Sequence, residues 1–172
     1  MLKPGEVHVW LARLKGETAA LRRECSHQAL RAILEKVTGA PVNFAVAEKG
    51  KPYLSGAPEV RFNLAHSHDL ALVGVALGVD VGVDIEQLRP LPEYAAIAER
   101  YFPPSEREGL DERNFFQRWT RIEAKLKARG VGLYGAGAEL GGEWTVEPID
   151  AGEGFAAAVA VERAGMRVVV HG

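Results

Sequence analysis

Apolar and polar residues alternate in several short stretches of the chain, with the period of two that is typical of β-strands. The alternation predicts strands at residues 7–14, 42–47, 60–66, 70–77, 79–88, 143–149, 154–162 and 166–172. Between them, the segment EKGKPYLSGAP (48–58) carries two glycines and two prolines. These residues punctuate regular structure, so a loop is expected there.

Other stretches place apolar residues three or four positions apart, which predicts helices. A first helix is expected over 17–37, with Leu21 on its apolar side and Gly39 beyond its end. A short helix is expected near 93–101, and a long one over 114–129 that ends at Gly130. Ahead of the long helix, Ser105 and Glu108 have the spacing of a capping box. A glycine-rich loop is expected over 130–142.

Each half of the chain therefore consists of a strand, a long helix and antiparallel strands. This order predicts an α+β fold built from two similar modules in tandem. The boundary is expected at residues 78 and 79, giving halves 1–78 and 79–172. The prediction rests on element order, because no residue-level repeat is visible.

Composition limits the class of protein without assigning a function. The chain has 172 residues, 47% of them hydrophobic, which is ordinary for a globular protein with one core or two small packed halves. No apolar run approaches the roughly 18 residues of a membrane span, and no signal peptide is expected at the N-terminus. Cys25 is the only cysteine, which excludes an internal disulfide and suits the cytoplasm.

Two carboxylates interrupt the apolar segment VGVDIEQL (81–88). Asp84 and Glu86 alternate with apolar residues and so point to the same face of the expected strand. On the long helix, Glu123 falls within the apolar arc, where a carboxylate is costly unless something compensates it. The three carboxylates would suit a magnesium ion if they converge. The alternatives are a solvated strand end and a Glu123–Lys127 helix pair.

Two further stretches admit both structural and functional interpretations. His66, in FNLAHSHD, ends an apolar strand and is either a structural residue or part of a site. With His68 and Asp69 it matches a zinc hydrolase pattern only in part, and further zinc ligands are few. Lys51 follows Gly50 in a loop that would either approach a phosphate closely or form a solvated turn.

Taken together, the segments GKPYL, FNLAHS, GVDIE and FFQRWTRIEAKLKARGVGL resemble the 4′-phosphopantetheinyl transferase superfamily. They occur in the family's order within residues 48–133. The closer similarity is to the type with two tandem halves, the surfactin-synthetase-activating type, which acts on peptide synthetases and acyl carrier proteins. The resemblance implies a pseudo-dimeric α+β fold with the active site between the halves.

The resemblance also implies an activity. Such an enzyme transfers 4′-phosphopantetheine from coenzyme A to a serine of an acyl or peptidyl carrier protein and releases 3′,5′-ADP. It uses Mg²⁺, with Mn²⁺ as an alternative, and serves fatty acid, polyketide or nonribosomal peptide biosynthesis. A cytoplasmic monomer is expected, with coenzyme A and a carrier protein as partners and neither nucleic acid nor membrane.

Individual residues match the family's functional positions. By resemblance, Asp84, Glu86 and Glu123 are the metal ligands, and Glu123, Lys127 and His66 are the catalytic residues. The coenzyme A contacts are expected from Lys51, Arg31, His66 and Lys127, with His27 as an alternative to Arg31 at the 3′-phosphate.

The chain departs from the family pattern in three respects. Ala65 stands where the family has serine, Ile122 stands where it has lysine, and the C-terminal part is short. These departures leave two alternatives open. One is a homologue that binds coenzyme A or a carrier without catalysis, and the other is a metal-dependent phosphohydrolase.

Overall fold

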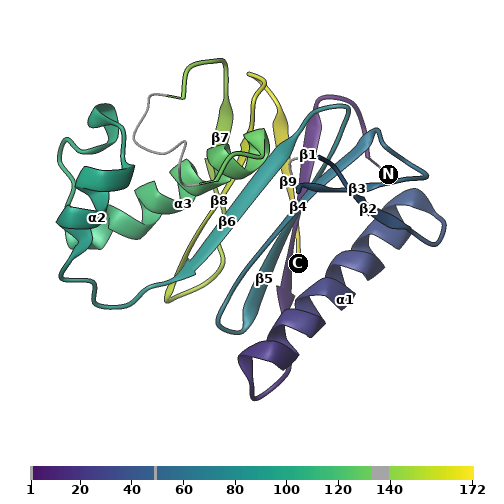
Figure 1. Cartoon of the computed structure of the whole chain (residues 1–172), viewed down its shortest axis with the longest axis horizontal. Helices are drawn as coiled ribbons and strands as arrows, with labels where there is room; N and C mark the ends of the chain where they lie inside the picture. Colours follow the sequence, from purple (N-terminus) through teal and green to yellow (C-terminus); the bar gives the residue numbers. More distant parts are fainter. Residues whose placement is uncertain (1, 49, 133–139) are drawn as a thin grey trace.

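A computed structural model describes residues 2–48, 50–132 and 140–172. The elements, in chain order, are β1 (Glu6–Arg13), α1 (Ala19–Thr38), β2 (Phe44–Val46), β3 (Pro52–Leu54), β4 (Val60–Ser67), β5 (Leu70–Leu77), β6 (Val81–Gln87), α2 (Tyr94–Tyr101), the 3₁₀ turn η1 (Pro104–Glu106), α3 (Glu112–Arg129), β7 (Thr145–Pro148), β8 (Phe155–Val161) and β9 (Arg167–His171). The α+β class predicted from the sequence is confirmed (Figure 1).

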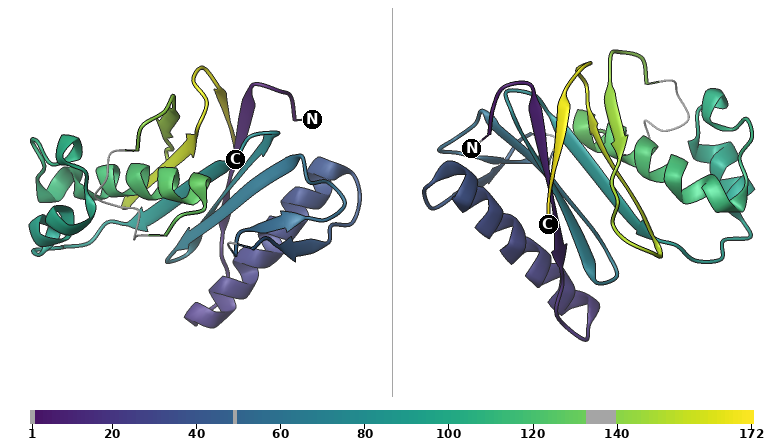
Figure 2. Two further views of the ribbon diagram at one scale, coloured as in Figure 1. Left: turned by 45° about the horizontal axis from the view of Figure 1, so that its top comes forward. Right: turned by 180° about the vertical axis from the view of Figure 1, so that it is seen from behind.

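The strands form two main sheets and a separate β2–β3 hairpin. The first sheet has the order β4-β5-β1-β9, and the second has the order β6-β8-β7. In the first half, β1 pairs antiparallel with β5, the second strand of the β4–β5 hairpin that follows α1. In the second half, β6 pairs antiparallel with β8, the second strand of the β7–β8 hairpin that follows α3. The C-terminal strand β9 crosses to the first sheet and pairs parallel with β1, as both views in Figure 2 show.

Apolar side chains of the two sheets pack together in one core between them. The core between them includes Val9, Leu72, Val83, Ile85 and Val159. On the outer face of the first sheet, Leu30 and Leu34 of α1 pack against Phe62 and Val75. Helix α3 covers the outer face of the second sheet (Figure 1). The layers are therefore helix, sheet, sheet and helix.

The first helix begins and ends close to the predicted residues. Thr18 caps α1 by accepting a hydrogen bond from the backbone N–H of Leu21, and Gly39 ends the helix with a left-handed φ of 73°. The prediction that Leu21 lies on the apolar side was wrong, because its side chain is 51% exposed. The buried positions are Ser26, Leu30 and Leu34. No helix among the described residues is long and apolar enough to cross a membrane.

The expected loop at 48–58 was wrong in part. Residues Pro52–Leu54 form β3, which pairs antiparallel with β2. Proline is compatible with this position because a strand in a two-stranded hairpin is an edge strand, where a missing N–H leaves no partner unsatisfied. Gly50, Pro52 and Gly56 favoured a loop in the prediction, so the three-residue strand β3 was not recognised.

The predicted cap at Ser105 was also wrong. Residues 104–106 form the short η1 turn, and α3 is capped by Asp111. The Asp111 carboxylate accepts from the backbone N–H of Asn114, and the Asn114 side chain accepts from the N–H of Asp111. Of the expected loop at 130–142, residues 133–139 lie outside the described residues.

This capping box leads to a stability prediction. Asp111→Ala is expected to lower the free energy of unfolding by about 1 kcal/mol, because an N–H in the first turn of α3 loses its acceptor. Asp111→Ser should retain most of the stability, since serine is also a good N-cap. Urea unfolding of the three proteins would test this, and equal stability of the alanine variant would contradict it.

Candidate active site

Strand β6 presents two chemically different faces. Val81, Val83 and Ile85 are buried in the core between the sheets. The alternate residues Gly82 and Asp84 point the other way, toward α3. Strand β6 thus has the predicted apolar face and the predicted carboxylate face, and the carboxylate face with Asp84 lies under α3.

Helix α3 approaches the second sheet closely because the contacting residues are small. Ala124 packs on Ala158 and Ala160 of β8. A Cβ added at Gly82 would lie 1.9 Å from the backbone carbonyl oxygen of Ala124 and 2.4 Å from the amide nitrogen of Ala128. Only a glycine permits this approach, which brings the last turns of α3 to the carboxylate face of β6.

Asp84 and Lys127 form the central contact of the site. Lys127 donates a hydrogen bond from Nζ to Asp84 Oδ1 over 2.6 Å. Asp84 is only 6% exposed. Its second oxygen, Oδ2, is buried and has no hydrogen-bond partner in the part of the chain that the structure describes. A buried carboxylate oxygen without a donor is costly, so this atom requires a donor or a cation.

Burial has the largest effect on the Asp84 carboxyl. It raises the pKa of Asp84 from 3.8 to about 7, although the positive charge and hydrogen bond of Lys127 lower it. The negative charges of Glu123 and Glu86 raise it further. Glu86 lies on β6 with Asp84, whereas Glu123 acts from α3, so the structure brings the three carboxylates into one electrostatic neighbourhood.

Glu123 and Glu86 complete this neighbourhood. Burial raises the pKa of the Glu123 carboxyl, Lys127 lowers it, and Glu86 raises it. Glu86 also forms an ion pair with Arg89 over 3.2 Å. A carboxyl with a raised pKa accepts a proton more readily than an exposed one, which suits Glu123 to acid–base chemistry.

The carboxylates are not arranged as a completed metal site. No group of three carboxylate, imidazole or thiolate side chains among residues 2–48, 50–132 and 140–172 is placed to hold a metal ion. Lys127 is the cation that contacts Asp84. The set of Asp84, Glu86 and Glu123 therefore stays a prediction. In its favour, the partnerless Oδ2 of Asp84 is a hard oxygen of the kind that magnesium prefers.

Positive charges of both halves surround His66. Partial burial and the charges of Arg23, His27 and Lys127 lower the pKa of His66. The imidazole of His66 is therefore neutral near pH 7, while its surroundings attract anions. The sequence interpretation missed Arg23, although Arg23 and His27 are four residues apart and so share one face of α1.

Arg31 has a different environment. Its guanidinium donates to the backbone carbonyl of Val42 over 2.8 Å and lies 5.0 Å from the centre of the Phe44 ring. It lines a cavity of about 570 Å³ between α1 and the β2–β3 hairpin, together with His27. The Arg31 guanidinium is thus partly used by its bond to Val42 and its contact with Phe44. His27 lines the same cavity and is close enough to His66 for its charge to lower the pKa of His66.

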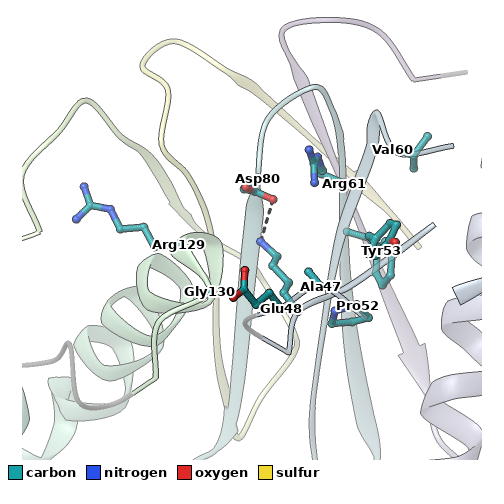
Figure 3. Close-up of a pocket in the computed structure, with 11 residues that line it drawn as sticks. Ala47, Glu48, Pro52, Tyr53, Val60, Arg61, Asp80, Arg129 and Gly130 are labelled. Carbon is teal, nitrogen blue, oxygen red and sulfur yellow. Dashed lines mark hydrogen bonds and ion pairs between the residues drawn. The ribbon is translucent and has the colours of Figure 1, made fainter. Parts of the chain in front are cut away.

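Lys51 joins three segments that are distant in the sequence. Its Nζ donates to Asp80 Oδ1 over 3.0 Å and to the backbone carbonyl of Ala128 over 2.9 Å. Lys51 and Asp80 line a second cavity, of about 270 Å³, where Figure 3 shows Asp80 pointing inward and Arg129 pointing away. The Lys51 amine holds the loop before β3 against the start of β6 and the end of α3.

This geometry predicts a structural effect of Lys51. Lys51→Met is expected to lower the free energy of unfolding by about 1–2 kcal/mol, because the carbonyl of Ala128 loses a charged donor. Lys15→Met, at an exposed lysine, is the matched control and should change stability little. Thermal and urea unfolding would measure both, and equal effects of the two substitutions would contradict a structural role.

The two residues that depart from the family pattern are buried. Ala65 packs in the core between the sheets, and Ile122 packs with the aromatic residues of α3 and Phe102. Neither side chain is exposed toward solvent at the site.

Comparison with known proteins gives an independent result. Residues 80–158 match the sequence model of the 4′-phosphopantetheinyl transferase superfamily. These residues contain Asp84, Glu86, Glu123 and Lys127. This part of the chain is similar to the 4′-phosphopantetheinyl transferase superfamily. The family resemblance stated from the motifs is therefore confirmed.

Individual relatives agree with this assignment. The chain is 39% identical over 117 residues to the 4′-phosphopantetheinyl transferase HetI of Nostoc sp., covering 60% of this chain and 49% of HetI. It is 35% identical over 114 residues to psf-1 of Bacillus pumilus, covering 60% and 48%. It is 30% identical over 135 residues to AcpT of Salmonella typhi, covering 74% and 65%. The aligned part is thus about half of HetI and psf-1.

Proposed function

We propose that this protein is a member of that superfamily, and that it transfers the 4′-phosphopantetheine group of coenzyme A to a serine hydroxyl of an acyl or peptidyl carrier protein, releasing 3′,5′-ADP. The observation that carries the proposal is the buried Asp84, whose Oδ2 lacks a partner beside Lys127 and near Glu123. The positive region around His66 lies within electrostatic reach of Lys127. An acidic site next to an anion-attracting surface suits a metal-dependent reaction of a phosphorylated substrate.

A divalent cation fits the carboxylate side of this site. Asp84, Glu86 and Glu123 would hold Mg²⁺, or Mn²⁺ in its place. When bound, the ion neutralises the charge of the pyrophosphate and favours departure of 3′,5′-ADP. The carboxylates then remain ionised, because a cation opposes their mutual repulsion.

Glu123 is the proposed general base. Burial raises the pKa of its carboxyl in the absence of a cation. A bound cation would keep the carboxylate ionised, and an ionised carboxylate can accept a proton. In the reaction it takes the proton of the attacking serine hydroxyl, directly or through one water molecule. The serine oxygen then forms its bond to the β-phosphorus of coenzyme A, and the bond between that phosphorus and the bridging oxygen breaks.

Lys127 and His66 act on the phosphates. The Lys127 ammonium stabilises the negative charge on the β-phosphate or protonates the leaving phosphate of 3′,5′-ADP. His66, neutral near pH 7, donates one hydrogen bond to the pyrophosphate. Lys51 and Arg31 stay candidates for coenzyme A contacts, with His27 as the alternative at the 3′-phosphate.

We further propose that residues 1–78 and 79–172 are two structural repeats of a pseudo-dimer, with the active site between them. The equivalent strand orders β4-β5-β1 and β7-β8-β6 support this interpretation. The protein would then belong to the two-half type and act as a monomer. The single cysteine, Cys25, is a free thiol and agrees with a cytoplasmic location.

The proposal is tested by incubating the protein with coenzyme A, Mg²⁺ and a panel of apo carrier proteins, then weighing each carrier. The expected result is a mass increase of one phosphopantetheine, which disappears when the carrier serine is replaced by alanine. Absence of the increase across acyl and peptidyl carriers would overturn the proposal.

The same reaction mixtures separate the alternative functions. A non-catalytic homologue would bind coenzyme A in calorimetry without modifying any carrier. A phosphohydrolase would release free phosphopantetheine from coenzyme A when no carrier is present. The burial of Ala65 and Ile122 favours the transferase over a degenerate homologue, because these departures are accommodated by core packing.

A further inference from the structure

The seam between the two halves is bridged by side chains of β4. Strands β4 and β6 belong to different sheets. The backbone N–H of Val83 donates to Asn63 Oδ1 over 2.9 Å, and the backbone N–H of Gln87 donates to Ser67 Oγ over 2.9 Å. Two backbone groups of β6 are therefore satisfied by side chains of β4.

The spacing of these two bonds defines a register. Asn63 and Ser67 are four residues apart on β4, and their partners Val83 and Gln87 are four residues apart on β6. Alternate residues of a strand share a face, so both polar side chains project to the same side of β4. Equal spacing in the same direction means that the strands run parallel with a constant offset of 20 positions.

This register relates the functional residues of the two halves. His66 directly precedes Ser67, and Glu86 directly precedes Gln87, so the bond between Ser67 and Gln87 sets His66 level with Glu86. A slip of one residue would exchange the faces of a strand, and a slip of two would move His66 by about 6.6 Å. Either slip would separate the histidine of one half from the carboxylates of the other.

We infer that Asn63 and Ser67 are positioning residues of the transferase reaction, which hold His66 of the first half in register with Asp84 and Glu86 of the second. We call this pair the seam clamp. The inference rests on the proposed function, because it assigns the register a purpose in catalysis. Each residue acts through the strand to which it is bonded. Asn63 also lines the cavity between α1 and the β2–β3 hairpin, so Ser67 is the cleaner test of the clamp.

The substitutions Asn63→Leu and Ser67→Ala remove the two acceptors with little change of size. We expect hydrogen exchange at the amides of Val83 and Gln87, respectively, to become about 10-fold faster, since each loses one hydrogen bond. The kcat of transfer should fall about 10–100-fold in each variant. In Ser67→Ala, KM for coenzyme A should change less than about 3-fold, because Ser67 acts through Gln87 of β6. Ser67→Thr keeps an acceptor hydroxyl and should restore exchange and kcat.

Thr145→Val is the matched control. Thr145 Oγ1 accepts from the buried backbone N–H of Met166 over 3.0 Å and donates to the backbone carbonyl of Arg163 over 2.7 Å, and all three residues lie within the second half. This substitution should cost at least as much stability as the clamp substitutions without a comparable loss of kcat. All assays are made at a temperature where circular dichroism shows each variant folded.

The outcomes separate the seam clamp from the proposed function. Unchanged exchange at Val83 and Gln87 in the variants overturns the clamp, whatever the transfer assay shows. Wild-type kcat in both single variants, or an equal loss in Thr145→Val, overturns its catalytic purpose. If the wild-type protein modifies no carrier, the proposed function fails. Faster exchange in the variants would then reduce the clamp to a purely structural contact.

Discussion

Replacing Gly82 by alanine is expected to lower the free energy of unfolding by about 3 kcal/mol or more. The new methyl carbon would lie 1.9 Å from the carbonyl oxygen of Ala124 and 2.4 Å from the amide nitrogen of Ala128. Both atoms are helix backbone, so no side-chain rotation relieves the overlap. Helix α3 must move away from β6, which also separates Lys127 from Asp84.

Gly56→Ala provides the matched control for this prediction. Nothing lies within 4 Å of a Cβ added at Gly56, and its backbone does not adopt a left-handed φ. Its stability should equal or slightly exceed that of the wild type, because alanine restricts the unfolded chain. Urea unfolding curves would compare the three proteins. A Gly82→Ala variant as stable as Gly56→Ala would mean that α3 does not approach β6 as closely as described.

Asp84→Asn is expected to reduce carrier modification about 1000-fold or more, because the site loses a central negative charge. The substitution keeps the size and shape of the side chain. It should also abolish stabilisation by Mg²⁺ in thermal unfolding, which reports on the metal independently of activity. Initial rates of transfer and melting temperatures with and without Mg²⁺ would measure the two effects.

The same substitution changes how stability depends on pH in the presence of a chelator. Burial raises the pKa of Asp84 from 3.8 to about 7, so the folded protein binds this proton more tightly than the unfolded chain does. The resulting stabilisation is fully present below about pH 4 and is lost as the pH rises through 7. The wild-type melting temperature should therefore fall more steeply over this range than that of Asp84→Asn.

Asp80→Asn is the control for both effects. Asp80 lies just before β6, and its half-exposed carboxylate pairs with Lys51. An asparagine there still accepts a hydrogen bond, so the Mg²⁺ response and the pH dependence should stay close to the wild type. If Asp80→Asn and Asp84→Asn lose the same activity, or if Mg²⁺ still stabilises Asp84→Asn, the assignment of Asp84 as a metal ligand is wrong.

The periodicity of the sequence was sufficient for the long elements. Helix α1 ends at the predicted Gly39, and the long strands β4, β5 and β6 lie where apolar alternation placed them. The three-residue strand β3 was missed because it is too short to show a period and contains Pro52. Its formation depends on pairing with β2, which the pattern of residues within β3 does not show.

Local signals failed where two neighbouring segments offered the same pattern. Both Ser105 and Asp111 precede a residue suited to a capping box three positions later. The choice is made by packing, because Arg118 of α3 donates to the carbonyls of Glu106 and Glu108 and so joins the helix to the turn that precedes it. Without these contacts, the capping-box pattern alone cannot decide whether the helix begins after Ser105 or after Asp111.

The sequence by itself determined the α+β class, the carboxylate face of β6 and the unusual placement of Glu123, because each follows from a period of two or 3.6 residues. Only the tertiary structure decided which groups meet. The bond of Lys127 to Asp84 depends on the small residues under α3, and that of Lys51 to Ala128 joins positions 77 apart. Such contacts depend on the distance between packed layers, which no local period encodes.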